Sequence, residues 1–258
     1  MSDDDEAPVL LHESAGVLVV TLNRPAARNA INTATARAIA GAMETLDARS
    51  DLVVGVITGA GSSFCAGMDL KAFLAGERPS IPGRGFAGLV ERPPDKPLIA
   101  AVEGHAIAGG FEIALACDLI VASLDATFGL PEVRRGLVAA GGGLLRLPSR
   151  VPMALAAEWA LTGALVPASR AAEVGLVNRL TEPGRALDVA LELAALISAN
   201  GPLAVRATKQ ILSESPGWPA GEAFDRQRAV SEPVRASEDA REGALAFKEK
   251  RPPRWRGV

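Results

Sequence analysis

The sequence predicts an α/β fold in which a mostly parallel sheet is backed by helices. Two β-branched apolar runs, at residues 16–22 and 52–58, are typical of buried strands. Between them, residues 34–46 place Ile39 and Leu46 at helical spacing among many alanines. A strand, a helix and a second strand in this order form a unit whose two strands run parallel in one sheet.

The same order recurs in the middle of the chain. A strand is expected at residues 98–102, a helix at 110–117 and a second strand at 119–122. Before them, residues 76–97 contain five prolines and four glycines, which is typical of a long loop. We expect this loop either to cover a site or to be a plain excursion from the core.

Helical patterns dominate the carboxy-terminal part of the chain. The turn at residues 200–202 divides the sequence into a core, residues 1–200, and a helical carboxy-terminal region, residues 201–258. One short strand is expected at residues 176–180. The expected helices span residues 153–161, 168–174, 186–198, 203–212 and 220–230.

Composition excludes several classes of protein. The 258 residues are 48% hydrophobic, enough for one large core, and the net charge of −3 comes without a basic stripe. With no tyrosine either, the chain lacks the basic and aromatic surface that nucleic-acid binding requires. The longest apolar stretch, residues 106–122, is short for a membrane span and carries Glu112 and Asp118, so we expect no membrane partner.

The sequence predicts a cytoplasmic protein without disulfides or a metal site. Cys65 and Cys117 are the only cysteines, both in apolar surroundings, which suits a reducing compartment and gives no spacing for metal ligands. Residues 1–6 are acidic and lack the basic start and the apolar core of a signal peptide.

Two glutamates are candidates for acid/base chemistry. Glu112 lies in the apolar stretch at residues 98–122, where an ionised carboxylate without a partner or a task would cost several kcal/mol. Glu132 follows Pro131 in a short turn and precedes a glycine run at residues 141–143. Loops on a rigid scaffold often carry catalytic groups, so we interpret the two carboxylates as an acid/base pair.

Glycine-rich turns follow two of the expected strands, at residues 61–69 and 108–112. Glycine lets the backbone approach a ligand closely and direct N–H groups toward it. The second turn opens a helix, where free N–H groups and the helix dipole favour an oxyanion. Together the two turns can supply two converging donors, although glycine at such turns is also common for steric reasons.

Four motifs, at residues 64–70, 96–105, 109–112 and 128–132, resemble in order and spacing the crotonase (enoyl-CoA hydratase/isomerase) superfamily. The resemblance covers nearly the whole chain. It implies the crotonase-like fold, in which ββα units repeat and a carboxy-terminal helical oligomerisation region builds trimers that commonly pair into hexamers. We therefore expect a homotrimer or hexamer with an acyl-CoA thioester site in residues 1–200.

The resemblance also implies roles for the candidate residues. The backbone N–H groups of Ala66 and Gly109 correspond to the oxyanion hole that holds the thioester carbonyl. Glu112 and Glu132 correspond to two glutamates that, in hydratases, hold a water molecule and pass its proton to the α-carbon. The expected activity is a hydro-lyase reaction that converts a trans-2-enoyl-CoA to a 3-hydroxyacyl-CoA. It needs no metal and no redox cofactor, and CoA is part of the substrate.

Further positions correspond to residues that family members use around CoA and the acyl group. Ala26 stands where a basic residue is usual, and Ala108 stands where many members have a further glycine. Phe247 and Lys250 are expected near the CoA pocket of the same or a neighbouring subunit. The full set of expected substrate contacts is Arg28, Met68, Asp69, Lys71, Phe247 and Lys250.

Several alternative activities remain open at this point. Local matches at residues 86–89, 145–148 and 237–243 resemble carnitinyl-CoA dehydratase, which applies the same chemistry to a cationic acyl group. An enoyl-CoA isomerase and a non-catalytic acyl-CoA-binding protein are further alternatives, both disfavoured by the presence of the two glutamates. A thiol nucleophile, Cys65 with His105 as its base, is a separate hypothesis.

Overall fold

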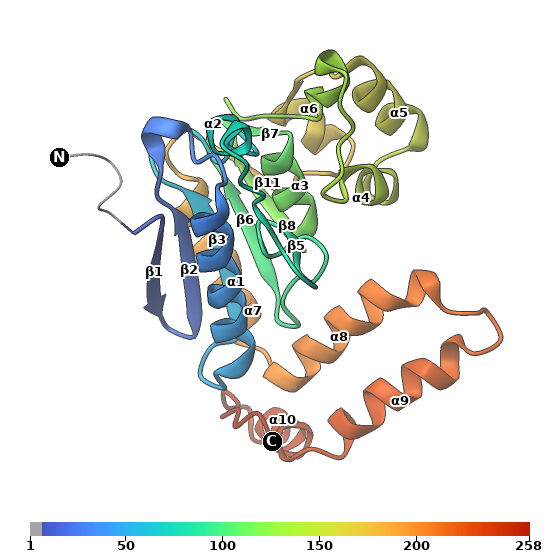
Figure 1. The fold of residues 1–258 in the computed structure, drawn as a ribbon. Coiled ribbons are helices and arrows are strands. Elements are labelled where there is room, and N and C mark those ends of the chain that lie inside the picture. Colours follow the sequence, from blue (N-terminus) through green and yellow to red (C-terminus); the bar gives the residue numbers. More distant parts are fainter. Residues whose placement is uncertain (1–6) are drawn as a thin grey trace.

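The computed structural model describes residues 7–258, so residues 1–6, on which the signal-peptide argument rests, lie outside it. Its centre is a six-stranded sheet with the order β1-β2-β3-β6-β8-β11 (Figure 1). β1 and β2 form an antiparallel pair, and every other neighbouring pair is parallel, which confirms the predicted fold class. The strands are β1 Val9–Ser14, β2 Val17–Leu22, β3 Val54–Gly59, β6 Leu98–Val102, β8 Leu119–Ser123 and β11 Arg179–Thr181.

Helices cover both faces of this sheet, which explains why its inner strands are apolar without interruption. α1 (Thr33–Ala48) buries Ile39 against one face, and α7 (Ala186–Ser198) buries three alanines against the other. Successive side chains of a strand point to opposite faces. Along β2, Leu18 accordingly packs in the cluster of α1 and Val19 in the cluster of α7.

The ββα unit repeats along the chain, as the resemblance implies. β1 and β2 lead into α1, β6 and β7 lead into α3, and β8 and β9 lead into the 3₁₀ helix η2 and then α4. β7 pairs with β9 in parallel, so α3 and η2, which follow these two strands, begin at the same edge of the sheet. The bounds are β7 His105–Ile107, α3 Gly109–Ala116, β9 Thr127–Gly129, η2 Pro131–Arg135 and α4 Gly143–Arg150.

Shorter elements complete the core around this second sheet. β10 pairs with β9 in antiparallel fashion, and β4 pairs with β5 in a small hairpin. These elements are α2 Leu70–Leu74, β4 Ser80–Ile81, β5 Gly85–Phe86, α5 Met153–Thr162, β10 Val166–Pro167 and α6 Ala168–Glu173.

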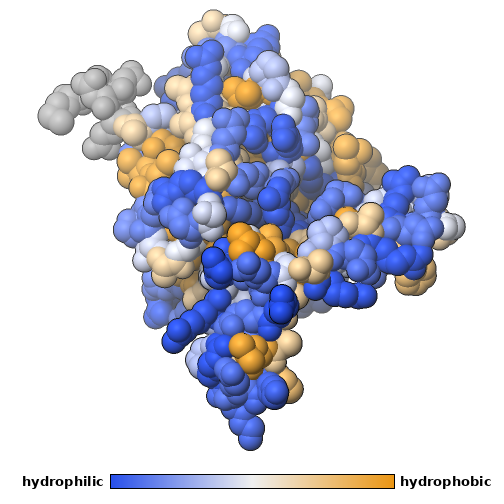
Figure 2. Space-filling view, turned by 90° about the horizontal axis from the view of Figure 1, so that it is seen from below, coloured by the Kyte–Doolittle hydropathy of each residue, from blue (hydrophilic) through white to orange (hydrophobic). Residues whose placement is uncertain are grey.

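The carboxy-terminal helices α8 (Pro202–Glu214) and α9 (Ala223–Arg235) form an arm that projects away from the sheet (Figure 1). No residue of either helix is buried. Charge holds α8 to the core, with Lys209 Nζ 2.7 Å from an oxygen of Asp118. Figure 2 views the molecule from the side where α10 (Glu238–Glu249) lies, and shows small, separate apolar patches among hydrophilic side chains. The division at residue 200 stays a prediction.

The strand expected at residues 176–180 is β11, which begins only at Arg179. The N–H groups of Leu176 and Val177 donate to the carbonyl of Ala171 and form a turn after α6. The apolar residues of that turn resemble a strand in sequence, so the predicted strand began three residues too early.

The segment at residues 76–97 is not a plain excursion from the core. Its hairpin of β4 and β5 is followed by three fully or almost fully buried residues, Ala87, Leu89 and Val90. The Cβ atom that a residue larger than Gly88 would carry lies 2.5 Å from the Ala36 carbonyl of α1. The segment is therefore anchored against α1.

Within residues 7–258, no single helix is long and apolar enough to cross a membrane, and α7 with residues 202–217 meets those criteria only as a pair bent by 108°. The same residues contain no group of three or more His, Cys, Asp or Glu side chains that could hold a metal ion. Cys65 and Cys117 are both free and buried.

Candidate active site

Glu112 lies in the first turn of α3 and is only 4% exposed. Its Oε1 atom accepts hydrogen bonds from the backbone N–H groups of Gly141, at 2.7 Å, and Gly143, at 3.0 Å. A Cβ atom at Gly141 would lie 2.5 Å from Oε2 of the same carboxylate. The predicted glycine run therefore forms a cradle for Glu112 that larger residues would displace.

Opposing effects act on the charge of Glu112. Burial raises the pKa of this carboxyl, whereas the N–H groups of Gly143 and Gly141 and the positive charge of Arg146 lower it. Burial is the largest of these effects, so the net pKa is raised. Glu112 can thus exchange a proton closer to neutral pH than an exposed glutamate can.

Glu132 lies in η2, directly after Pro131, whose fixed backbone suits the first position of a helix. Burial raises the pKa of its carboxyl, and the negative charge of Glu112 raises it further. Oε2 of Glu132 is buried and has no hydrogen-bond partner among the described residues. Buried oxygens of this kind are normally satisfied, so this atom is available to a water molecule or a substrate.

The structure contradicts the prediction that Ala66 donates its N–H to a substrate. The Ala66 N–H already donates to the carbonyl of Arg28 at 3.0 Å. Gly67 has a φ of 92°, and this turn changes the side to which the following N–H groups point. Because the Asp69 N–H then donates to the carbonyl of Ile31, the Met68 N–H is directed to the other side.

Met68 and Gly109 instead supply the two free N–H groups. Cys65 pairs in parallel with Ala106, and a Cβ atom on Gly67, the residue before Met68, would lie 3.0 Å from the nitrogen of Gly109. Among the hydrogen bonds of the described residues, neither the Met68 N–H nor the Gly109 N–H is a donor. Gly109 is the first residue of α3, where N–H groups have no acceptor within the helix. These two groups can together hold an oxyanion.

Ala108 holds the start of α3 in an unusual conformation. Its φ of 53° and ψ of −126° lie in a region that residues with a Cβ atom rarely adopt. The Ala108 N–H donates to the carbonyl of Gly129 in β9 at 2.8 Å, which fixes this turn. Strain of about 1–3 kcal/mol at such a residue is typical of functional sites.

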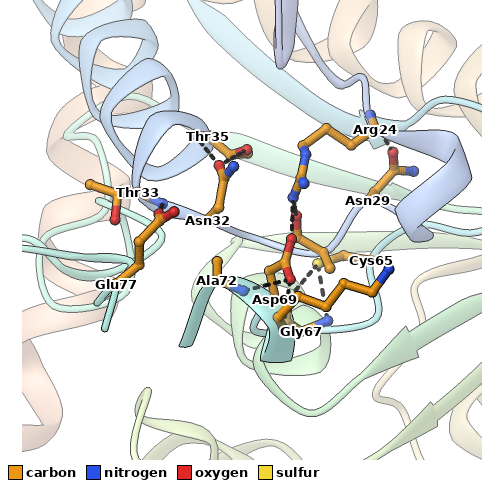
Figure 3. Close-up of polar contacts among 12 residues, drawn as sticks. Arg24, Asn29, Asn32, Thr33, Thr35, Cys65, Gly67, Asp69, Ala72 and Glu77 are labelled. Atoms are coloured by element: carbon orange, nitrogen blue, oxygen red, sulfur yellow. Dashed lines mark hydrogen bonds and ion pairs between the residues drawn. The ribbon is translucent and has the colours of Figure 1, made fainter. Parts of the chain in front are cut away.

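Asp69 serves the scaffold of the site. Its carboxylate accepts hydrogen bonds from the Lys71 N–H, at 3.0 Å, and the Ala72 N–H, at 3.2 Å, and so begins α2 (Figure 3). Arg24 Nη1 lies 2.9 Å from the same carboxylate. Burial alone would raise the pKa of Asp69, but the hydrogen bonds from Ala72 and Arg24 outweigh it and lower the pKa. The role of Arg24 could not be predicted from the sequence, because its partner Asp69 lies far away along the chain.

The other expected substrate contacts fall into two groups. Arg28 and Lys71 are exposed and Met68 is half-buried, all on segments that adjoin the free N–H groups. Phe247 and Lys250 lie on or just after α10, which is at the bottom of the view in Figure 1 and well separated from α3 beside the central sheet. Within one chain these two residues do not reach Glu112. That they contact the CoA pocket of a neighbouring chain stays a prediction.

The hypothesis of a thiol nucleophile is wrong for this geometry. Cys65 is completely buried, and burial raises the pKa of its thiol to about 12. The His105 ring is exposed, and its Nδ1 lies 2.7 Å from the Thr127 hydroxyl. No hydrogen bond joins the two side chains among the described residues, so the imidazole cannot activate the thiol.

Comparison with known proteins agrees with this geometry. The description Enoyl-CoA hydratase/isomerase belongs to the family model that matches residues 12–258. Enoyl-CoA hydratase EchA19 of Mycobacterium tuberculosis is 43% identical, and the match covers 99% of both chains. Carnitinyl-CoA dehydratase of Proteus mirabilis is 43% identical, with 93% of this chain and 95% of that protein covered.

Solved structures agree as well. The crystal structure of enoyl-CoA hydratase EchA1 from Mycobacterium marinum is 59% identical and superposes with a TM-score of 0.97, covering 98% of this chain and all of that one. The chain is therefore an enzyme of the enoyl-CoA hydratase/isomerase family, the crotonase superfamily.

Proposed function

We propose that the protein is an enoyl-CoA hydratase that adds water to a trans-2-enoyl-CoA to give a 3-hydroxyacyl-CoA. One observation carries the proposal: Glu112 is held in the glycine cradle, while Glu132 has a buried carboxyl oxygen without a hydrogen-bond partner among the described residues. The free oxygen of Glu132 gives a water molecule a place to bind. Retention of both carboxylates favours hydration over double-bond isomerisation.

The chemistry follows from these groups. The thioester oxygen accepts hydrogen bonds from the N–H groups of Met68 and Gly109. As the water oxygen bonds to the β-carbon, the electron pair of the double bond moves onto the thioester and forms an enolate, which those donors stabilise. The carboxylate pair takes a proton from the water and delivers one to the α-carbon. Only water and protons are exchanged, so the reaction requires no redox cofactor.

A second candidate, a carnitinyl-CoA dehydratase-like activity on crotonobetainyl-CoA, has specific support. The identity to the Proteus mirabilis carnitinyl-CoA dehydratase, 43%, equals that to EchA19. Against it, the enoyl-CoA hydratase EchA1 from Mycobacterium marinum is 59% identical. We therefore retain an uncharged enoyl group as the first substrate to test.

We further propose that the protein is a cytoplasmic homotrimer or hexamer. α8 and α9 bury no residue, although Leu212 and Phe224 on them are apolar and 71% and 73% exposed. Further copies of the chain would cover such side chains. Two free cysteines suit a reducing compartment.

The first experiment follows the loss of the conjugated-thioester absorbance of crotonyl-CoA with wild type and Glu132→Gln. We expect rapid loss with wild type and a rate lower by about 10²- to 10⁴-fold for the variant, the usual contribution of an acid/base group. A crotonobetainyl-CoA arm separates the two candidates, because faster turnover of that substrate favours the carnitinyl activity. Binding of CoA esters without turnover of any conjugated substrate would instead support a non-catalytic acyl-CoA-binding protein.

A further inference from the structure

Arg146 lies on α4 beside the cradle of Glu112, although no step of the proposed reaction uses it. Its guanidinium covers Gly142, because a Cβ atom on that glycine would lie 2.3 Å from Nη1 of Arg146. Gly142 sits between Gly141 and Gly143, whose N–H groups hold Glu112. A half-buried cation thus lies over the loop that holds the buried carboxylate.

The same guanidinium reaches a distant part of the chain. Its Nη2 atom donates to the carbonyl of Val90 at 2.5 Å, across 56 residues of sequence. Val90 and Leu89 donate their N–H groups to the carbonyl of Phe86, so residues 86–90 form a turn. The contact with Arg146 therefore fastens this turn to α4.

The turn at residues 86–90 packs against Gly109, one residue of the proposed oxyanion hole. The Phe86 ring lies against Gly109, since a Cβ atom there would come within 2.4 Å of the ring atom Cε1. Gly109 donates one of the two N–H groups assigned to the thioester oxygen. The position of the turn therefore sets how closely that N–H group is enclosed.

We propose that Arg146 is a positioning residue that joins the two halves of the active site, the cradle of Glu112 and the turn at residues 86–90 against Gly109. The effect on catalysis rests on the proposed hydration, whereas the clamp on the turn does not.

The charges around Glu112 fix the direction of the expected pH effect. Arg146 faces it from α4 and Glu132 from η2. Burial and the positive charge of Arg150 on the same helix lower the pKa of Arg146, whereas Cys117, which follows α3, raises it. Removal of the Arg146 charge raises the pKa of Glu112, so a higher pH is then needed to ionise it.

The test compares Arg146→Met with Arg146→Lys and with Arg150→Met as a matched control. Arg150 lies one turn further along α4, is also half-buried, and donates to the carbonyl of Cys117 instead of Val90. Hydrogen exchange of the backbone amides at residues 86–90 is measured first, in the absence of any thioester. We expect exchange about 10- to 100-fold faster in Arg146→Met, as for loss of one hydrogen bond from a charged donor, and unchanged exchange in Arg150→Met.

The second measurement is the pH profile of kcat/KM with crotonyl-CoA. The acidic limb should move to higher pH in Arg146→Met and stay in place in Arg150→Met. Arg146→Lys keeps the positive charge but loses the planar guanidinium group. The acidic limb of its pH profile should therefore match that of wild type, and its amide exchange rate at residues 86–90 should lie between those of wild type and Arg146→Met.

The outcomes separate the two proposals. Unchanged exchange at residues 86–90 in Arg146→Met, or the same change in Arg150→Met, would overturn the clamp and reduce Arg146 to general packing. If Arg146→Met does not fold, the test rests on Arg146→Lys. Amide exchange at residues 86–90 that equals the wild-type rate in this variant would overturn the role of the guanidinium group. If wild type hydrates no conjugated thioester, the proposed function fails, and the exchange data alone still decide the clamp.

Discussion

Glu112 is buried and Glu132 is half-buried, and the protein holds the two carboxyl groups unequally. Glu112 accepts two backbone N–H groups and faces the cation of Arg146. Glu132 has one oxygen without a partner among the described residues and faces the negative charge of Glu112. Hydrogen bonds to a carboxylate favour its charged form. The asymmetry therefore stabilises the charged form of Glu112 more than the charged form of Glu132.

The same asymmetry predicts that Glu132→Gln gains stability while it loses activity. The folded state raises the pKa of Glu132 above its unfolded value, so the folded protein binds this proton more readily. Stability from this group is therefore present below the ordinary glutamate range and is lost as pH rises through the raised pKa. At pH 7 the ionised carboxylate destabilises the fold, and glutamine removes that penalty.

Denaturant unfolding of wild type and Glu132→Gln across pH measures this effect. The variant should be more stable at pH 7, and the difference should narrow as pH falls. Glu158→Gln, at an exposed position of α5, serves as the control and should leave stability unchanged. A variant no more stable than wild type at pH 7 would show that Glu132 carries no such penalty.

At the scale of elements, the start of α3 combines a free N–H group with a strained residue. Ala108, with φ 53°, turns the chain from β7 into α3, whose first N–H group is that of Gly109. Glycine adopts that conformation without the clash that a Cβ atom causes. The protein thus keeps strain at the turn that builds half of the oxyanion hole.

Ala108→Gly should therefore stabilise the protein by about 1 kcal/mol, the lower end of the range for a strained residue. The matched change Ala114→Gly lies inside the same helix at ordinary geometry and should cost about 1 kcal/mol. Thermal unfolding of both variants gives the comparison. Destabilisation by both changes would mean that Ala108 is not strained.

Much of the site could be predicted from local sequence, because Glu112, Glu132 and Gly109 each lie in a distinctive apolar or glycine-rich stretch. The second N–H donor could not be placed, because the positive φ of Gly67 decides which N–H group turns toward α3. The role of Arg146 could not be predicted either, because its partner, Val90, is 56 residues away. Helix α4 has no clear helical signal, since it begins in a glycine run and contains Pro148.

At the scale of the whole molecule, the arm of α8 and α9 has too little contact with the core to explain its extended position. Ion pairs of Lys209 with Asp118 and of Arg206 with Asp95 hold α8, and no residue of either helix is buried. Charge pairs near the surface contribute little on their own. An arm of this kind is stable when other copies of the chain pack against it.

Light scattering should accordingly give three or six times the mass of one chain. Phe224→Asp on α9 should lower that mass, because a charge in a subunit interface is left without a partner. Leu11→Asp is the control, since Leu11 is 50% exposed on the edge strand β1, on the far side of the sheet from the arm. If wild type is a monomer, the exposed arm is a free surface and the assembly is refuted. If the mass falls and hydration falls with it, a neighbouring chain completes each site, which is where Phe247 and Lys250 would then act.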